Sequence, residues 1–204
     1  DGADALVGGD GDDTLSGGEG NDLLIGGEGH DTAVYATIDP SGIAFDAESG
    51  QWVVPDGAEG TDRLSAIEAI QHEDGRILLV GGGSEYASIQ AAVDAAQAGD
   101  TIVVAPGTYA PFATSFGGPT NVTILGLEGA TIDATNDVGL PARIVDLRAD
   151  GTTFRGFTIE GPGGLAEAGV HVGISVSGQG VTVEGNTISN ILTGIQTNTA
   201  CPAG

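Results

Sequence analysis

The sequence predicts an all-β protein, in which a parallel β-roll with a β-rich cap is followed by a right-handed parallel β-helix closed by one short helix. Three observations predict this fold: a nine-residue repeat at the start, a slower repeat of about thirty residues between 122 and 197, and one amphipathic segment between them. Repeated units of this kind stack because none can bury its apolar face alone. We expect a roll at 1–35, a cap and linker at 36–83, and the first coils of a β-helix at 84–204.

The first residues of the chain repeat one pattern every nine residues. They read DGADALVGG, DGDDTLSGG, EGNDLLIGG and EGHD, so an aspartate recurs as Asp4, Asp13, Asp22 and Asp31. Glycine recurs before each aspartate, and a loop of this sequence needs the left-handed backbone angles that glycine reaches without strain. The three residues after each aspartate are expected to form a short strand whose central residue, Leu6, Leu15 or Leu24, points inward. The frame therefore predicts alternating tight loops and short strands.

Stacked loops of this composition predict a calcium site. Two nonapeptides make one turn, so the loop of Asp4 stacks on that of Asp22 and the loop of Asp13 on that of Asp31. Calcium takes six to eight oxygen ligands, which carboxylates and backbone carbonyls provide. We predict Ca²⁺ as the cofactor and these residues as its ligands: Asp4, Gly9, Gly11, Asp13, Gly18, Gly20, Asp22, Gly27, Gly29 and Asp31.

The other polar residues of the loops are assigned lesser roles. Asp12, Asn21 and His30 precede the repeated aspartates and are expected to orient the loops, while Asp10, Glu19 and Glu28 are expected to face solvent. Sequence rich in glycine and aspartate can also be a solvated linker. Four copies in register favour the calcium roll over that alternative.

Residues 1–35 resemble the RTX repeats of proteins exported by type I secretion. The segments DTAVYATID and GTDRLSAIEAIQHEDGRILL resemble the folding cap that follows such repeats. The resemblance implies an extracellular or cell-surface location and calcium-driven folding.

Composition restricts the partners of the chain. Five arginines and no lysine stand against 29 Asp and Glu, which gives a formal net charge of −24. Such a charge argues against nucleic acids and anionic membranes, because both require a basic surface. The single cysteine, Cys201, forms no disulfide within the chain, and no apolar run reaches the length of a membrane span. The chain starts inside a repeat and ends in TNTACPAG, so we expect a piece of a longer protein.

The cap is predicted from short strand-like segments. A strand is expected at 32–38, and a hairpin is expected to join 43–45 with 51–54. Trp52 is expected to cover the open end of the roll rather than to stack on a sugar, because a roll end exposes unpaired strand edges. His72 is expected in a solvated turn, and Gly81 to Ser84 read as the linker.

The second half predicts one helix and then coils of β-structure. Ile89, Ala92, Val93 and Ala96 share one helical face, with Ser88 as the N-cap and Gly99 as the stop. The segments VTILG, TTFRG and VTVEG then align at 122, 152 and 181, and each precedes a Thr-Ile pair; further strands are expected at 144–147, 172–176 and 194–197. Residues 84–200 resemble the pectin-lyase-like β-helix superfamily, and Asn186 and Asn190 are expected to serve an internal asparagine ladder.

That resemblance implies acidic polysaccharides as a substrate class, but no complete catalytic site is present. Cleavage or epimerisation beside a uronate carboxylate needs a base and a cation or arginine. The candidates are Arg143, Arg148 and Arg155, with Asp146, Asp150 and His171 nearby. Surface ion pairing is the favoured explanation of these residues. The Tyr-Gly-Phe-Asp-Pro-His type motif of alginate epimerases is missing, so no catalytic residue is assigned and whether the chain is an enzyme stays open.

Two functions follow as hypotheses. The first is a secreted or surface calcium-binding module whose folding is driven by extracellular Ca²⁺, carrying a β-helix that acts as a carbohydrate-binding or structural scaffold. Its partners would be calcium and an acidic polysaccharide, with self-assembly through β-helix ends as a further option. The alternative is the N-terminal part of a secreted polysaccharide lyase or uronate epimerase.

Overall fold

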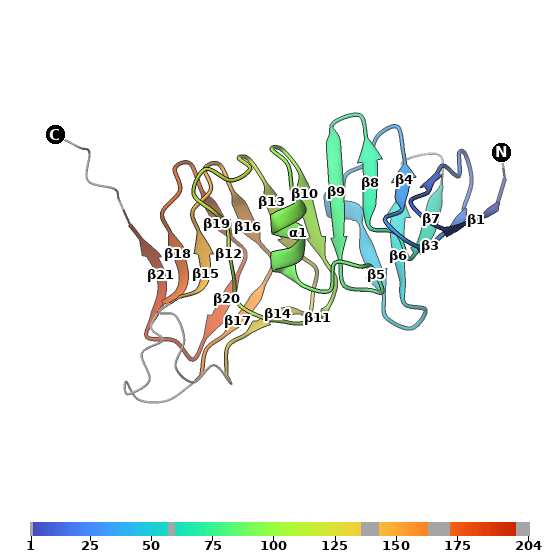
Figure 1. The fold of residues 1–204 in the computed structure, drawn as a ribbon. Helices are drawn as coiled ribbons and strands as arrows, with labels where there is room; N and C mark the ends of the chain where they lie inside the picture. The colour runs from blue at the N-terminus through green and yellow to red at the C-terminus, as the bar shows by residue number, and fades with distance from the viewer. Residues whose placement is uncertain (1, 57–59, 136–142, 163–171, 199–204) are drawn as a thin grey trace.

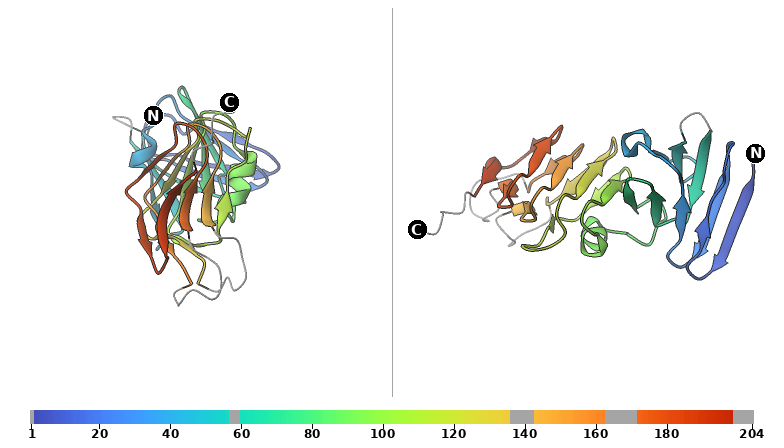
Figure 2. Two further views of the ribbon diagram at one scale, coloured as in Figure 1. Left: turned by 90° about the vertical axis from the view of Figure 1, so that its left-hand side faces the viewer. Right: turned by 90° about the horizontal axis from the view of Figure 1, so that it is seen from above.

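The computed structural model describes residues 2–56, 60–135, 143–162 and 172–198 of the 204-residue chain. The chain is mostly β, with parallel sheets and one short α-helix, as the sequence predicts. The strands stack along one axis, so that β1 (Ala5–Asp10) lies at one end and β21 (Thr193–Thr197) at the other (Figures 1 and 2). The helix is too short to cross a membrane, and no other α-helix occurs in the described residues.

The nonapeptides form the first layers of this stack. They contain β1, β2 (Thr14–Leu15), β3 (Leu23–Glu28) and β4 (Thr32–Val34). β1 pairs with β3 in parallel, with Leu6 opposite Leu24, and β2 pairs with β4, with Leu15 opposite Ala33. Each residue thus faces its equivalent two nonapeptides later, which confirms the predicted turn of the roll.

The cap continues the roll and then turns back over it. It contains a 3₁₀ turn (Pro40–Gly42), β5 (Ala44–Asp46), β6 (Gln51–Pro55), β7 (Thr61–Ser65), β8 (Ala69–His72) and β9 (Gly75–Val80). β7 and β8 add in parallel to β3 and β4, whereas β6 pairs antiparallel with both β5 and β7. Trp52 is 1% exposed and packs edge-on against Phe45 at 5.3 Å between ring centroids. Burial excludes sugar stacking and confirms that Trp52 belongs to the cap. The strand predicted at 32–38 ends earlier, at Val34.

Strands β9 and β10 (Thr101–Val104) join the two halves of the chain. They pair in parallel, and both of their faces are buried. Leu78, Val80, Ile102 and Val104 pack into the core of the second half, while Ile77, Leu79 and Val103 pack into the core under the cap. A strand covered on both sides reads as a continuous apolar run, which explains ILLV and TIVV.

The predicted linker lies directly beside this joint. Gly81 to Ser84 make a hydrogen-bonded turn rather than a loose spacer, because Gly81 N donates to the Tyr86 carbonyl at 2.9 Å and Ser84 Oγ donates to the Leu79 carbonyl at 2.7 Å. One sheet runs from β2 to β19 past this turn. The domain boundary between 83 and 84 stays a prediction.

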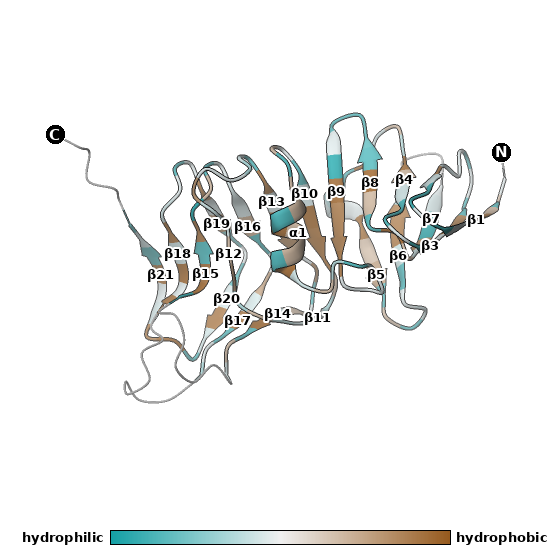
Figure 3. Cartoon of the chain, viewed as in Figure 1, coloured by the Kyte–Doolittle hydropathy of each residue, from teal (hydrophilic) through white to brown (hydrophobic). Residues whose placement is uncertain are grey.

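The second half is a parallel β-helix with three sheets. Its strands are β11 (Gly107–Tyr109), β12 (Phe112–Ala113), β13 (Thr123–Gly126), β14 (Ala130–Asp133), β15 (Arg143–Leu147), β16 (Thr153–Arg155), β17 (Thr158–Glu160), β18 (Val172–Val176), β19 (Thr182–Glu184), β20 (Thr187–Ser189) and β21. Thr123, Thr153 and Thr182 are in register, as are Ile132, Ile159 and Ile188. The predicted alignment of the slower repeat is therefore confirmed, and apolar residues concentrate along the strands (Figure 3).

Helix α1 (Ile89–Ala95) closes the sheet of the β-helix that contains β12, β15, β18 and β21. Ser88 Oγ accepts from Ala91 N at 3.2 Å, and Ile89, Ala92 and Val93 are buried, as predicted. The Gln90 side chain bonds both the N–H and the carbonyl of Ala113, so it occupies the edge of β12 that would otherwise be unpaired. The Asn186 side chain bonds the backbone of Phe154 and Phe157. Asn190 is exposed and does not take its predicted place in an internal asparagine ladder.

Phe154 tests the core of the β-helix. Its side chain is fully buried and stacks on Phe157 at 4.7 Å between ring centroids. We expect Phe154→Ala to lower the free energy of unfolding by about 3–5 kcal/mol through lost burial and a residual cavity, measured by urea titration at saturating calcium. Phe116→Ala is the matched control because Phe116 is 69% exposed, and it should change stability by about 0.5 kcal/mol or less. Equal effects of the two changes would contradict the assigned core.

Candidate metal centre

The repeated aspartates are linked by hydrogen bonds into two columns along the stack. Asp4 N donates to Asp22 Oδ1, and Asp13 N donates to Asp31 Oδ1, both at 2.8 Å across one turn of the roll. Each bond uses one carboxylate oxygen of the later aspartate. The other oxygen of each carboxylate is left for a different partner.

Both columns continue past the repeats into the cap. Asp22 N donates to Asp62 Oδ1 and Asp31 N donates to Glu68 Oε2, again at 2.8 Å. Asp62 is fully buried and Glu68 is 3% exposed. The nonapeptide pattern missed both residues. For Asp62 a signal exists, because Gly60-Thr-Asp-Arg-Leu64 repeats the frame of Gly20-Asn-Asp-Leu-Leu24 and pairs with it in register.

Three carboxylate oxygens of the repeats are buried without a hydrogen-bond partner among the described residues. They are the Oδ2 atoms of Asp13, Asp22 and Asp31. A buried polar atom left unsatisfied costs about 1–3 kcal/mol, and more when it is charged. These oxygens therefore lack the positively charged or proton-donating neighbour that burial requires.

Carbonyl oxygens of the next layer share the same space. A Cβ atom placed on Gly8 would lie 2.5 Å from Asp13 Oδ2 and 2.7 Å from the Gly26 carbonyl oxygen. Glycine thus leaves open a small cradle into which a carboxylate and a carbonyl of successive layers project. In the described residues no three His, Cys, Asp or Glu side chains come together as a metal site, so a cation held here would need backbone carbonyls as well as carboxylates. This donor set fits calcium, a hard cation that prefers oxygen.

The predicted glycine ligands are brought together in the same layers. A Cβ atom placed on Gly20, Gly27 or Gly29 would strike the carbonyl oxygen of the equivalent glycine one turn earlier, Gly2, Gly9 or Gly11 respectively. Gly18 meets no described residue in this way. Asp12 Oδ1 accepts from His30 N at 2.9 Å, and Asn21 Oδ1 accepts from Thr61 N at 2.8 Å. These two bonds agree with the predicted loop-orienting role.

Asp62 differs from the repeat aspartates because the protein satisfies it. Tyr35 donates its hydroxyl to Asp62 Oδ2 at 2.9 Å. Burial, reinforced by the Asp62 carboxylate, raises the pKa of the Tyr35 hydroxyl, so the tyrosine keeps its proton and donates it in this hydrogen bond. Burial also raises the pKa of Asp62. Burial likewise raises the pKa of Glu68, whose Oε1 accepts from Glu85 N at 3.2 Å.

Comparison with known proteins agrees with calcium as the cofactor. Residues 1–33 match the profile of the RTX calcium-binding nonapeptide repeat, in four copies. No curated protein matches the chain. Among solved structures, the extracellular lipase LipA from Serratia marcescens is similar at 18% identity and a TM-score of 0.20, over 86% of this chain and 31% of that chain. The chain thus spans about a third of the length of that lipase. The RTX nonapeptide repeats of the present chain, residues 1–33, bind calcium.

Gly8 tests the cradle. We expect Gly8→Ala to weaken calcium binding about tenfold or more, because its Cβ would displace Asp13 Oδ2 and the Gly26 carbonyl, and about 1.4 kcal/mol suffices for that change. Isothermal titration with Ca²⁺ measures it. Gly42→Ala is the matched control, since its Cβ would meet only Pro55 Cγ at an ordinary 3.7 Å. Unchanged affinity in Gly8→Ala would contradict the proposed ligand geometry.

Proposed function

We propose that the chain is a secreted, calcium-binding module whose roll folds on meeting extracellular Ca²⁺ and which carries the β-helix as a scaffold. The observation that supports this most strongly is the set of unpartnered, buried Oδ2 atoms of Asp13, Asp22 and Asp31. We propose as the ligands Asp4, Gly9, Gly11, Asp13, Gly18, Gly20, Asp22, Gly27, Gly29 and Asp31. Calcium bound there would neutralise the carboxylates and join successive layers of the roll.

The negative charge of the roll explains why its folding would require calcium. The chain carries a formal net charge of −24, and the repeat stacks its carboxylates in columns. Without a cation these carboxylates repel one another and favour the extended chain. Extracellular calcium modules have dissociation constants of about 10⁻⁴ to 10⁻³ M, so their sites stay empty inside a cell. This arrangement suits type I export of an unfolded chain.

Several weak sites suffice for such a switch. At a free calcium concentration ten times the dissociation constant, each site stabilises the folded state by about 1.4 kcal/mol. The β-helix has a different source of stability from the roll, because its core consists of aliphatic and aromatic side chains such as Ile102, Ile124 and Phe154. We propose that the β-helix contributes most of the calcium-independent stability.

A calcium titration followed by far-UV circular dichroism tests this function. We expect the β signal to rise cooperatively near millimolar calcium, and the rise to be lost in the double variant Asp13→Ala with Asp31→Ala. The control is Asp10→Asn with Glu28→Gln, which removes two exposed charges that face each other on the same loops. Its transition should keep the wild-type midpoint or move to lower calcium. A wild-type signal that ignores chelator would refute the proposed function.

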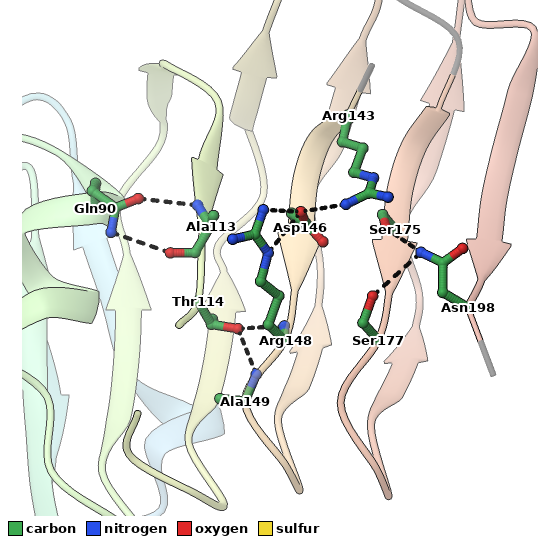
Figure 4. A network of polar contacts seen from close by, with 10 residues as sticks. All are labelled: Gln90, Ala113, Thr114, Arg143, Asp146, Arg148, Ala149, Ser175, Ser177 and Asn198. Atoms are coloured by element: carbon green, nitrogen blue, oxygen red, sulfur yellow. Dashed lines mark hydrogen bonds and ion pairs between the residues drawn. The ribbon is translucent and has the colours of Figure 1, made fainter. Parts of the chain in front are cut away.

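A groove on the β-helix supports a second role, the binding of an acidic glycan. The groove has a volume of about 420 Å³ and runs beside α1 and β15, where Gln90, Phe112, Arg143, Asp146 and Arg148 line it. Figure 4 shows Arg143 and Arg148 converging on Asp146 from either side. Arg143 Nη1 lies 3.0 Å and Arg148 Nη2 2.6 Å from the same Asp146 Oδ2.

The charge of this cluster is positive in a strongly acidic chain. Two guanidinium groups share one carboxylate, and each arginine side chain keeps 37% of its surface exposed. Arg148 also lies over the exposed ring of Phe116, 5.6 Å from its centroid. Guanidinium groups bind carboxylates through paired hydrogen bonds. The cluster therefore has the chemistry to bind a uronate.

The same cluster favours binding over turnover. Burial alone would raise the pKa of Asp146, but hydrogen bonds from Arg148 and Arg143 outweigh it and lower the pKa. A carboxylate held this way is a weak base for proton abstraction. Asp150 Oδ1 accepts from Gln179 N at 2.7 Å, and His171 lies outside the described residues. The lyase or epimerase alternative therefore depends on residues beyond this cluster.

Arg148→Gln tests the glycan role. We expect it to weaken binding of a galacturonic acid oligomer about tenfold, since a charge-assisted hydrogen bond contributes roughly 1.5–3 kcal/mol, while a neutral galactose oligomer is unaffected. Titration calorimetry at saturating calcium measures both. Arg63→Gln is the control, because Arg63 pairs with Asp46 at 2.9 Å in the cap, away from the groove. Equal loss in the two variants, or no binding by the wild-type chain, would reject the groove as the glycan site.

A further inference from the structure

The last layer of the roll meets a turn of the cap that takes the place of a repeat loop. Ile25 pairs with Ser65 and Thr32 pairs with Ala69, so residues 66–68 span the edge that residues 26–31 span one layer earlier. The cap turn is the shorter of the two. Ala66 opens it with a left-handed φ of +49°.

The oxygens at this junction repeat the arrangement seen inside the roll. A Cβ atom placed on Gly26 would strike both Asp31 Oδ2 and the carbonyl oxygen of Ala66. At Gly8, one layer earlier, the corresponding atoms are Asp13 Oδ2 and the Gly26 carbonyl. The Ala66 carbonyl therefore stands where a repeat loop would present its own carbonyl.

Asp31 has no other partner for this oxygen. Its side chain is fully buried, its Oδ1 accepts from Asp13 N, and its Oδ2 is unpartnered among the described residues. An anionic oxygen and a carbonyl oxygen repel each other when they share a small buried space. A cation between them would turn this repulsion into attraction.

Glu68 adds a second carboxylate to the same junction. It is 3% exposed, and it reaches back so that Oε2 accepts from Asp31 N at 2.8 Å. The longer side chain of glutamate compensates for the shorter turn, because an aspartate follows the loop one layer earlier. Each carboxylate oxygen has two lone pairs, so a single N–H bond leaves capacity for a metal.

We propose that the calcium ladder extends one step beyond the repeats, to an ion held between roll and cap by Asp31, the Ala66 carbonyl and Glu68. This inference rests on the proposed function, since it requires that the repeats themselves bind calcium. It assigns ligand roles to two residues that lie outside the nonapeptides.

Such an ion would be coupled to the start of the β-helix. The Glu68 carbonyl accepts from Leu79 N at 2.9 Å, and Glu68 Oε1 accepts from Glu85 N at 3.2 Å. Leu79 lies on β9, and Glu85 lies in the segment that leads to α1. Filling the site would therefore fix residues 79–88 as well as the last turn of the roll.

The test compares Glu68→Gln with wild type and with Glu73→Gln. Glu73 is an exposed carboxylate of the same cap, so its removal matches the change in charge. Calcium-binding stoichiometry is measured by titration calorimetry, and hydrogen exchange reports amide protection in residues 79–88. We expect Glu68→Gln to bind one ion fewer per chain, or to bind it at least tenfold more weakly, and to lose the calcium-dependent protection of 79–88. Glu73→Gln should match wild type.

The outcomes separate this inference from the function on which it rests. Unchanged stoichiometry and affinity in Glu68→Gln, with calcium still bound, would overturn the junction site alone. A wild-type chain that binds no calcium would overturn the proposed function. If Glu68→Gln fails to reach the wild-type far-UV signal, hydrogen exchange of the wild-type chain decides. Calcium-dependent protection of 79–88 supports the site, and its absence refutes it.

Discussion

The structure depends on how each buried carboxylate finds a partner. Asp100 and Asp146 are matched by arginine, at 2.6 Å from Arg76 and 2.6 Å from Arg148. Asp62 is matched by the hydroxyl of Tyr35. Asp13, Asp22 and Asp31 have neither, although their Oδ2 atoms are just as inaccessible. Burying a charge is tolerated only when it is paired or bound to a metal. We therefore propose that calcium, which RTX nonapeptide repeats bind, does for these aspartates what side chains do elsewhere in the chain. On this proposal, calcium partners the buried carboxylates of the roll as arginine partners Asp146 in the β-helix.

The roll and the β-helix hold their stacked layers together in different ways. The roll has few apolar side chains per layer, with Leu15, Leu24 and Ala33 inside, and its layers are held mainly by backbone pairing and by the aspartate columns. The β-helix has longer coils that enclose a continuous apolar core, which includes Ile124, Phe154 and Ile159. Longer coils enclose more apolar surface per layer, and burial contributes about 25 cal/mol per Å². We therefore expect the stability of the roll to depend on bound metal more than that of the β-helix does.

The sequence predicted the repeating parts well, because the length of the repeat determines which residues pair in neighbouring strands. The pairings of Leu6 with Leu24 and of Thr123 with Thr153 follow from spacing alone. The junctions were harder. Glu68 takes the place of an aspartate only because the cap turn is shorter than a repeat loop, and Ala66 presents its carbonyl from a backbone angle that alanine rarely adopts. Gly81 to Ser84 have the composition of a spacer, yet pairing of β9 with β10 confines them to a turn. Partners distant in the sequence decided each of these positions.

The two-sided burial of β9 and β10 has a consequence for solubility. Ile77 and Leu79 of β9 belong to the core under the cap, and Leu78 and Val80 belong to the core of the β-helix. The two cores therefore share this strand. A chain cut after residue 83 would present one apolar face of β9 and an unpaired edge to water. The remainder, starting at residue 84, would do the same with β10. Exposed, flat, apolar edges are templates for aggregation. Each half in isolation would therefore be prone to aggregation, although the whole chain buries both surfaces.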